Sequence, residues 1–128
     1  MNKKILTTAG IFGITAIILG AFGAHTLKQF LTSEQLTSFE TGVRYQMYHA
    51  FLLLFLGNTE TISLNTKKTI AILTVLGTIF FSGSIYLLST MSISNINFKP
   101  IGIITPIGGT LLIGAWGILT IHFSKKKI

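Results

Sequence analysis

The chain lacks several of the residues on which soluble enzymes depend. Its 128 residues include no cysteine, which excludes disulfides, thiolate nucleophiles and thiolate metal ligands. Only 10% of the residues are charged, and only three of them are acidic: Glu34, Glu40 and Glu60. Because soluble globular domains carry about 25% charged residues, this chain has too little charge to cover a surface that faces water.

Apolar residues take the place of the missing charge. They make up 49% of the sequence, and the mean hydropathy is +0.70. The net charge is +7, but the basic residues stand at the ends of apolar runs and not along one face with interleaved aromatic residues. The sequence therefore predicts a single-domain integral membrane protein (residues 1–128) that lies in a lipid bilayer and has no nucleic-acid partner.

Four apolar runs are the predicted membrane spans, at about residues 5–24, 43–57, 69–91 and 101–123. A helix crosses the ~30 Å hydrocarbon core with about 20 residues, a length that the first, third and fourth runs reach unaided. The first run also resembles a secretory signal peptide, but it is long for one, so we expect it to be retained. The predicted fold is all-α, a bundle of four transmembrane helices.

The second run is short, but a helix start lies upstream of it. Thr32 and Gln35 have the spacing of a capping box. Apolar residues then follow at helical intervals, at Leu36, Phe39, Val43, Met47 and Ala50. We predict one helix from about Ser33 to Leu56, with an amphipathic N-terminal part in the membrane interface and Gly42 as the candidate bend.

The basic residues predict the orientation of the bundle. If the N-terminus is inside, the inner side holds seven of the ten basic residues: Lys3, Lys4, Lys67, Lys68, Lys125, Lys126 and Lys127. The outer side holds Lys28, Arg44 and Lys99. By the positive-inside rule, we expect both termini in the cytoplasm.

Small residues mark the expected helix contacts, because close packing drives helix association in lipid. They form a face of the first run (Ala9, Gly13, Ala16, Gly20 and Gly23) and recur in the fourth (Gly108, Gly109, Gly114 and Gly117). The contacts lie either within one chain, which we favour, or in a homo-oligomer. Pro106 lies inside the fourth run and predicts a packing kink; a break that faces a ligand is the alternative.

Polar residues of the predicted spans fall mostly in the outer half of the bundle. This candidate cluster consists of His25, Tyr45, His49, Ser82, Ser84, Tyr86, Thr105 and Pro106. The hydroxyl groups suit interfacial or packing roles. For His49 a packing role and a functional role are equally supported, because an ionisable group within a span is a functional candidate.

The residues give no catalytic constellation. Without an acidic residue in the spans, a proton relay lacks its usual groups, and His25 and His49 with a distant glutamate match a zinc hydrolase poorly. Two histidines from two helices are a very unspecific signal for haem. We expect no enzyme, no cofactor and no metal site.

Four segments resemble one family of membrane proteins. They are Gly20-Ala-Phe-Gly-Ala-His25, Tyr45-Gln-Met-Tyr-His-Ala50, Phe81-Ser-Gly-Ser-Ile-Tyr86 and Thr105-Pro-Ile-Gly-Gly109 with Gly117 after Trp116. The family is domain of unknown function 423, which groups small bacterial membrane proteins with relatives among animal transmembrane proteins. The resemblance covers about Ala9 to Trp116 and implies a four-span protein of the bacterial cell membrane with no established activity.

Three functional hypotheses follow, of which the binding of a redox or metal cofactor has the least support. The first is a non-enzymatic membrane protein that acts through helix contacts, with another copy of itself or with a larger membrane protein partner. The second is a protein that binds or transports a lipid, a quinone or another amphiphile in the outer-half polar pocket.

Overall fold

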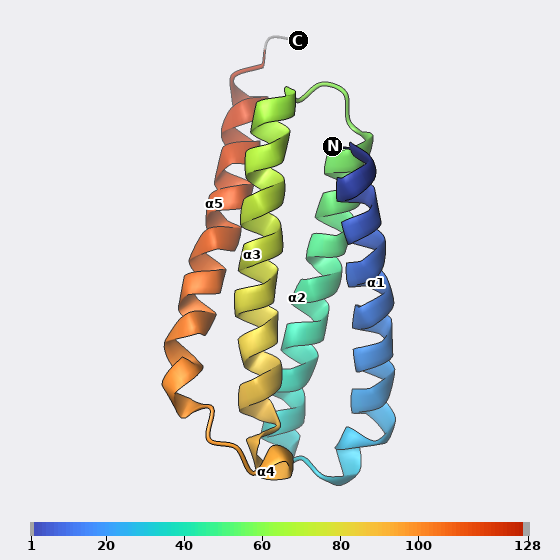
Figure 1. Ribbon diagram of the computed structural model, residues 1–128, viewed down its shortest axis with the longest axis vertical. Helices are drawn as coiled ribbons and strands as arrows, with labels where there is room; N and C mark the ends of the chain where they lie inside the picture. The colour runs from blue at the N-terminus through green and yellow to red at the C-terminus, as the bar shows by residue number, and fades with distance from the viewer. Residues whose placement is uncertain (1, 127–128) are drawn as a thin grey trace.

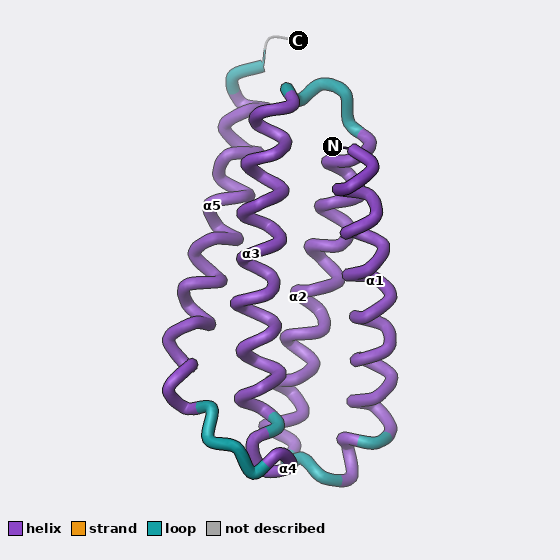
Figure 2. The backbone as a smooth tube through the Cα atoms, in the orientation of Figure 1, coloured by secondary structure: helices purple, strands orange, loops and turns teal. Residues whose placement is uncertain are grey.

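The computed structural model describes residues 2–126, which form helices and loops without strands (Figure 2). Lys127, which the sequence places with the inner basic residues, lies outside the described residues. The four long helices are α1 (Asn2–His25), α2 (Ser33–Asn58), α3 (Leu64–Ser89) and α5 (Ile104–Ser124). They run alternately up and down, so the start of α1 and the end of α5 lie at the same end of the bundle, which we call the termini end (Figure 1). The connections contain η1 (Leu27–Gln29), α4 (Met91–Ser94) and η2 (Lys99–Ile103).

The helices pack in the order of the chain. α1 packs on α2, α2 on α3, and α3 on α5, which places α1 and α5 at the two edges (Figure 1). Only 17% of the apolar window is buried in α1 and in the segment of α5, against 39% in α3. The exposed faces carry large apolar side chains such as Ile17 and Ile113, and such a surface is compatible with lipid and not with water.

Within residues 2–126, three segments are long and apolar enough to cross a membrane: Asn2–Gln29, Leu64–Ser89 and Lys99–Ser124. They contain the first, third and fourth predicted spans, so the span-forming character of these runs is confirmed. α2 is long enough but less apolar, as expected for the second run.

The predicted start of α2 is confirmed. The Thr32 hydroxyl accepts from the Gln35 N–H at 3.1 Å, and the Gln35 side-chain oxygen accepts from the Thr32 N–H at 3.0 Å. α2 then continues through Gly42 without a break. Glycine is required there for a different reason: an added Cβ would lie 2.8 Å from a ring carbon of Tyr86 on α3.

Several small residues of α1 and α5 contact other helices of the same chain. Ala9 and Ala16 are buried, and Cβ atoms added at Gly20 and Gly23 would contact Val43 and Phe39 of α2. Gly13 has open space at its Cβ position and is not part of this contact.

α5 approaches the backbone of α3 closely at Gly108. A Cβ added at Gly108 would lie 2.3 Å from the Phe81 nitrogen, and one added at Gly77 would lie 3.1 Å from the Gly108 carbonyl oxygen. Gly109 packs more loosely, with its added Cβ 3.6 Å from the Phe81 ring.

Pro106 does not kink the interior of a helix, which corrects the expectation from the sequence. Residues Lys99–Ile103 form a 3₁₀ helix, and α5 begins only at Ile104. Pro106 therefore lies in the first turn of α5, where backbone N–H groups have no partner within the helix and the missing donor breaks no bond.

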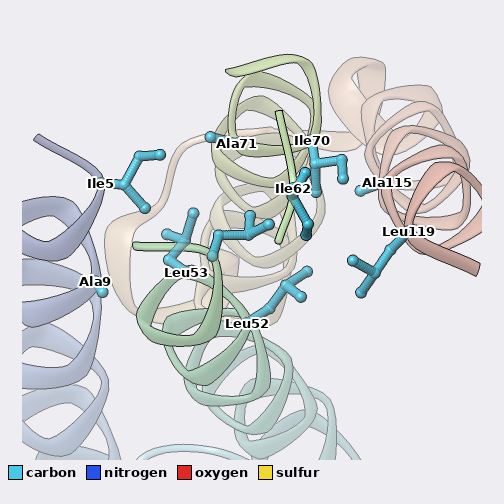
Figure 3. Close-up of a cluster of buried hydrophobic side chains, with 10 residues drawn as sticks. Ile5, Ala9, Leu52, Leu53, Ile62, Ile70, Ala71, Ala115 and Leu119 are labelled. Atoms are coloured by element: carbon cyan, nitrogen blue, oxygen red, sulfur yellow. The ribbon is translucent and has the colours of Figure 1, made fainter. Parts of the chain in front are cut away.

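Two apolar cores hold the bundle together. The larger one lies toward the end that holds the termini and joins all four long helices; Figure 3 shows Ile5 of α1, Leu53 of α2 and Ala71 of α3 pointing toward one another. The smaller one, around Leu27, Leu31 and Phe39, closes the opposite end.

A buried lysine at the start of α3 joins the start of α1 to the end of α2. Lys67 is only 4% exposed, and its ammonium donates to the Thr59 carbonyl at 2.5 Å and to the Asn2 side-chain oxygen at 3.0 Å. The Thr59 carbonyl follows the last turn of α2, where a cation also stabilises the helix dipole.

Candidate functional site

His49 connects α2 to α5 through two hydrogen bonds. Its side chain is 3% exposed. The Nε2 atom lies 3.1 Å from the indole nitrogen of Trp116, and Nδ1 lies 2.6 Å from the Tyr45 carbonyl oxygen one turn earlier. An indole N–H can only donate, so Nε2 is the acceptor, and Nδ1 carries the proton and donates to Tyr45. His49 is therefore an uncharged imidazole with both nitrogens bonded.

A groove opens beside this pair, lined by residues of α2 and α5 and by Phe81 of α3. We call it the α2–α5 groove; its volume is about 590 Å³, and its lining includes Tyr45, His49, Phe81, Ile113, Trp116 and Gly117. The lining is mostly aromatic and aliphatic. A Cβ added at Gly117 would contact nothing within 4 Å, so glycine leaves this part of the wall open.

A second polar contact joins α1, α2 and α3 around Gln46. Its side-chain nitrogen donates to the Phe12 carbonyl at 2.9 Å and to the Thr15 hydroxyl at 2.6 Å. Its side-chain oxygen accepts from the Tyr86 hydroxyl at 2.7 Å. Gln46 is 7% exposed, and these bonds use both ends of its amide, as burial in an apolar bundle requires.

Two serines make further contacts between helices. Ser82 donates to the Gly42 carbonyl at 2.7 Å and joins α3 to α2. Ser84 and Thr105 lie 2.5 Å apart and join α3 to the first turn of α5. These short interhelical bonds are typical of polar packing contacts in membrane bundles.

The structure thus divides the expected outer-half cluster. Ser82 and Tyr86 contact α2, Ser84 and Thr105 contact each other, and Tyr45 and His49 line the α2–α5 groove. His25 and Pro106 are exposed, at the end of α1 and the start of α5. His49 lies past the midpoint of α2, toward the termini end, because α2 begins at Ser33, well before the apolar run.

Sequence reasoning missed Gln46 and Trp116 as members of these contacts. The signal for Gln46 was an amide within a predicted span. Trp116 is the only tryptophan of the chain. The signal was its position in the middle of an apolar run, away from the membrane interface where tryptophans gather.

The described residues offer little metal-binding chemistry. Over residues 2–126 no group of three or more His, Asp or Glu side chains lies close enough to hold a metal ion. What the α2–α5 groove presents instead is apolar and aromatic surface, together with a histidine whose two ring nitrogens are already hydrogen-bonded.

Comparison with known proteins places the chain in a family. The model of the family described as "Protein of unknown function (DUF423)" matches residues 19–109. The chain belongs to this family. The match includes Tyr45, Gln46, His49 and Tyr86, whereas Trp116 lies beyond its end.

Several relatives align with this DUF423 protein over nearly its full length. The UPF0382 membrane protein of Staphylococcus haemolyticus is 41% identical over 126 residues, which cover 96% of this chain and 97% of that one. YwdK of Bacillus subtilis, a UPF0382 membrane protein, is 35% identical over 96% of this chain and 98% of its own. The UPF0382 inner membrane protein YgdD of Escherichia coli is 29% identical over 98% of this chain and 93% of its own.

No solved structure matches the chain. Together with the apolar helices, the relatives identify it as a membrane protein of an uncharacterised bacterial family. Their names state no enzymatic activity.

Proposed function

We propose that the chain crosses the cytoplasmic membrane four times, with both termini on the cytoplasmic side. α2 packs between α1 and α3, and its 26 residues extend ~39 Å, more than the ~30 Å hydrocarbon core. The termini end carries the lysine-rich segments around Lys4, Lys68 and Lys125, as the positive-inside rule requires. Arg44 donates to the Thr41 hydroxyl, one turn toward the opposite end, and so directs its charge toward the outer interface.

Single cysteines test this topology without interference, because the chain has none of its own. Ser92→Cys lies at the outer end and Thr61→Cys at the inner end, and both positions are exposed. A membrane-impermeant maleimide should label Ser92→Cys in intact cells and Thr61→Cys only after lysis. Labelling of both in intact cells would contradict the topology.

Within this topology we propose that the protein is a non-catalytic binding module for an amphiphile of the lipid or quinone class. The observation that carries this proposal is the α2–α5 groove, which opens directly beside the His49–Trp116 pair. Tyr45, Phe81 and Trp116 offer flat aromatic surface to a ring or an acyl tail. Small-molecule sites share this character, a mostly apolar lining with few polar groups.

Action through helix contacts has less support. Several of the small residues that motivated it contact other helices of the same chain: Ala9, Ala16 and Gly23 face α2, and Gly108 meets the backbone of α3. We therefore favour amphiphile binding over action through helix contacts.

A pair of glycine substitutions tests the binding proposal. Gly117→Leu places a side chain in the α2–α5 groove, and Gly10→Leu places the same side chain on the open outer face of α1; at neither glycine would a Cβ contact anything within 4 Å. Mass spectrometry of protein purified in a mild detergent should find a retained amphiphile on the wild type and on Gly10→Leu, and little on Gly117→Leu. Equal retention by all three proteins would contradict the proposal.

A further inference from the structure

A second groove lies on a different part of the bundle, where α1 and α3 face each other across α2. At the termini end it forms a hollow of about 310 Å³, whose apolar lining includes Ile5, Leu53, Ala71, Ile72 and Val75. Figure 3 shows Ile5, Leu53 and Ala71 converging there from three helices. We call it the α1–α3 groove.

The hollow offers almost no hydrogen-bonding group besides two ammonium groups. Thr8 also lines it, but its hydroxyl donates back to the Lys4 carbonyl at 2.8 Å. A separate hollow between α1 and α3 lies further toward the other end of the bundle; Ile11, Phe12 and Ile79 line it together with polar residues such as Thr15 and Gln46. The hollow at the termini end is apolar by itself, and it can hold part of an acyl chain.

Lys4 and Lys68 flank the hollow, one from α1 and one from α3. Both residues are exposed, and neither ammonium makes a hydrogen bond within the described part of the chain, whereas neighbouring Lys67 is bonded internally. Of the three acidic residues, Glu34 and Glu40 lie on the first turns of α2 at the opposite end, and only Glu60, in the loop after α2, lies at this end. The hollow is therefore apolar inside with uncompensated positive charge at its rim.

We infer that the α1–α3 groove is a binding site for an anionic phospholipid, in the leaflet that contacts the termini end of the bundle. The phosphate group lies between Lys4 and Lys68, and one acyl chain lies along Ile5, Leu53 and Val75. Basic pockets between transmembrane helices bind anionic headgroups because the ammonium charge adds to the burial of the acyl chain. A zwitterionic lipid has the same apolar fit but a weaker headgroup interaction.

This site is separate from the α2–α5 groove. The two hollows share no lining residue, so variants of Lys4 and Lys68 leave the surroundings of His49 and Trp116 unchanged. The test of one site can therefore fail while the test of the other succeeds.

Native mass spectrometry with two lipids of identical acyl chains tests the inference. Detergent-purified protein is titrated with dioleoylphosphatidylglycerol or dioleoylphosphatidylcholine. With about 1 kcal/mol per lysine, the wild type should prefer the anionic lipid about 30-fold. Lys4→Gln/Lys68→Gln should lose this preference and bind phosphatidylcholine as before. Equal binding of the two lipids by the wild type would overturn the inference.

Three matched variants complete the test. Lys125→Gln/Lys126→Gln removes the same charge after the end of α5, outside the groove, and should keep the preference for the anionic lipid. If this variant loses the preference to the same extent, the preference comes from general surface charge, and the proposed site is wrong. Lys4→Arg/Lys68→Arg keeps the charge and should keep the preference, so its loss would contradict a charge-based site. Thr8→Phe fills the hollow and should weaken binding of both lipids. Unchanged binding by Thr8→Phe would contradict an acyl chain in the groove.

Discussion

Trp116 of α5 donates its indole N–H to Nε2 of His49 on α2 across 3.1 Å. The bond joins two helices that are not neighbours in the packing order, since α3 lies between α2 and α5 in that order. His49 is saturated by this bond and by its bond to the Tyr45 carbonyl. A ligand in the α2–α5 groove therefore meets a pre-ordered His–Trp pair with no free imidazole nitrogen.

The His49–Trp116 bond should contribute measurably to stability. Trp116→Phe removes the N–H donor and part of the ring, and should lower the free energy of unfolding by at least about 0.6 kcal/mol, the average for interhelical bonds in membranes. His49→Ala also loses packing and should cost more, about 1–3 kcal/mol. A double-mutant cycle in detergent measures the coupling between the two residues. A coupling energy of zero would contradict the bond, and Tyr48→Phe, at an exposed position, serves as control.

Gln46 should be more sensitive than any single hydroxyl around it. Gln46→Leu leaves the Tyr86 hydroxyl without its acceptor and the Thr15 hydroxyl and Phe12 carbonyl without their amide donor. We expect a loss of about 1–3 kcal/mol in the free energy of unfolding. Tyr86→Phe removes one bond and should cost about 0.6 kcal/mol. If Gln46→Leu unfolds no more easily than the control Gln29→Leu, in the exposed connection η1, the network is not stabilising.

Two glycines of α5 should respond to alanine in opposite ways. Gly108→Ala puts a methyl group against the backbone of Phe81. The overpacking should lower the free energy of unfolding by about 1–3 kcal/mol or more. Gly117→Ala enters open space and should stabilise the helix by up to about 1 kcal/mol. Thermal unfolding in detergent compares the two variants. A stable Gly108→Ala protein would contradict the close approach of α3 and α5.

Lys67 should be required for the order of the termini end. Lys67→Met removes the donor to Thr59 and Asn2, and we expect a loss of about 1–3 kcal/mol with faster amide hydrogen exchange near Thr59. Lys125→Met, at an exposed lysine, should change stability by less than about 0.5 kcal/mol. Similar exchange in both variants would argue against the cap.

Local signals made the helices predictable. The capping box of Thr32 and Gln35 lies within four residues, and the structure confirms it. The three strongly apolar runs also needed no tertiary information. Pro106 was misread because the start of α5 depends on the 3₁₀ segment Lys99–Ile103, which hydropathy does not reveal.

The contacts of the site were less predictable, because they depend on rotation and register between helices. His49 was noticed as an ionisable residue in a span, but its partner Trp116 lies 67 residues away, and no pattern in one sequence reports such a pairing. Tyr86 and Ser82 share a helix face, yet one bonds Gln46 and the other the Gly42 carbonyl. A single polar cluster was therefore expected where the structure has several separate contacts.

We expect an amphiphile to occupy the α2–α5 groove, and Trp116 is a built-in reporter of this site because it is the only tryptophan of the chain. The most direct measurement is quenching of its fluorescence by decylubiquinone, in wild type, Gly117→Leu and Gly10→Leu in the same detergent. We expect saturable quenching in the wild type and Gly10→Leu, and a loss of saturation in Gly117→Leu, whose leucine fills the groove. Linear quenching of equal slope in all three proteins would contradict the claim.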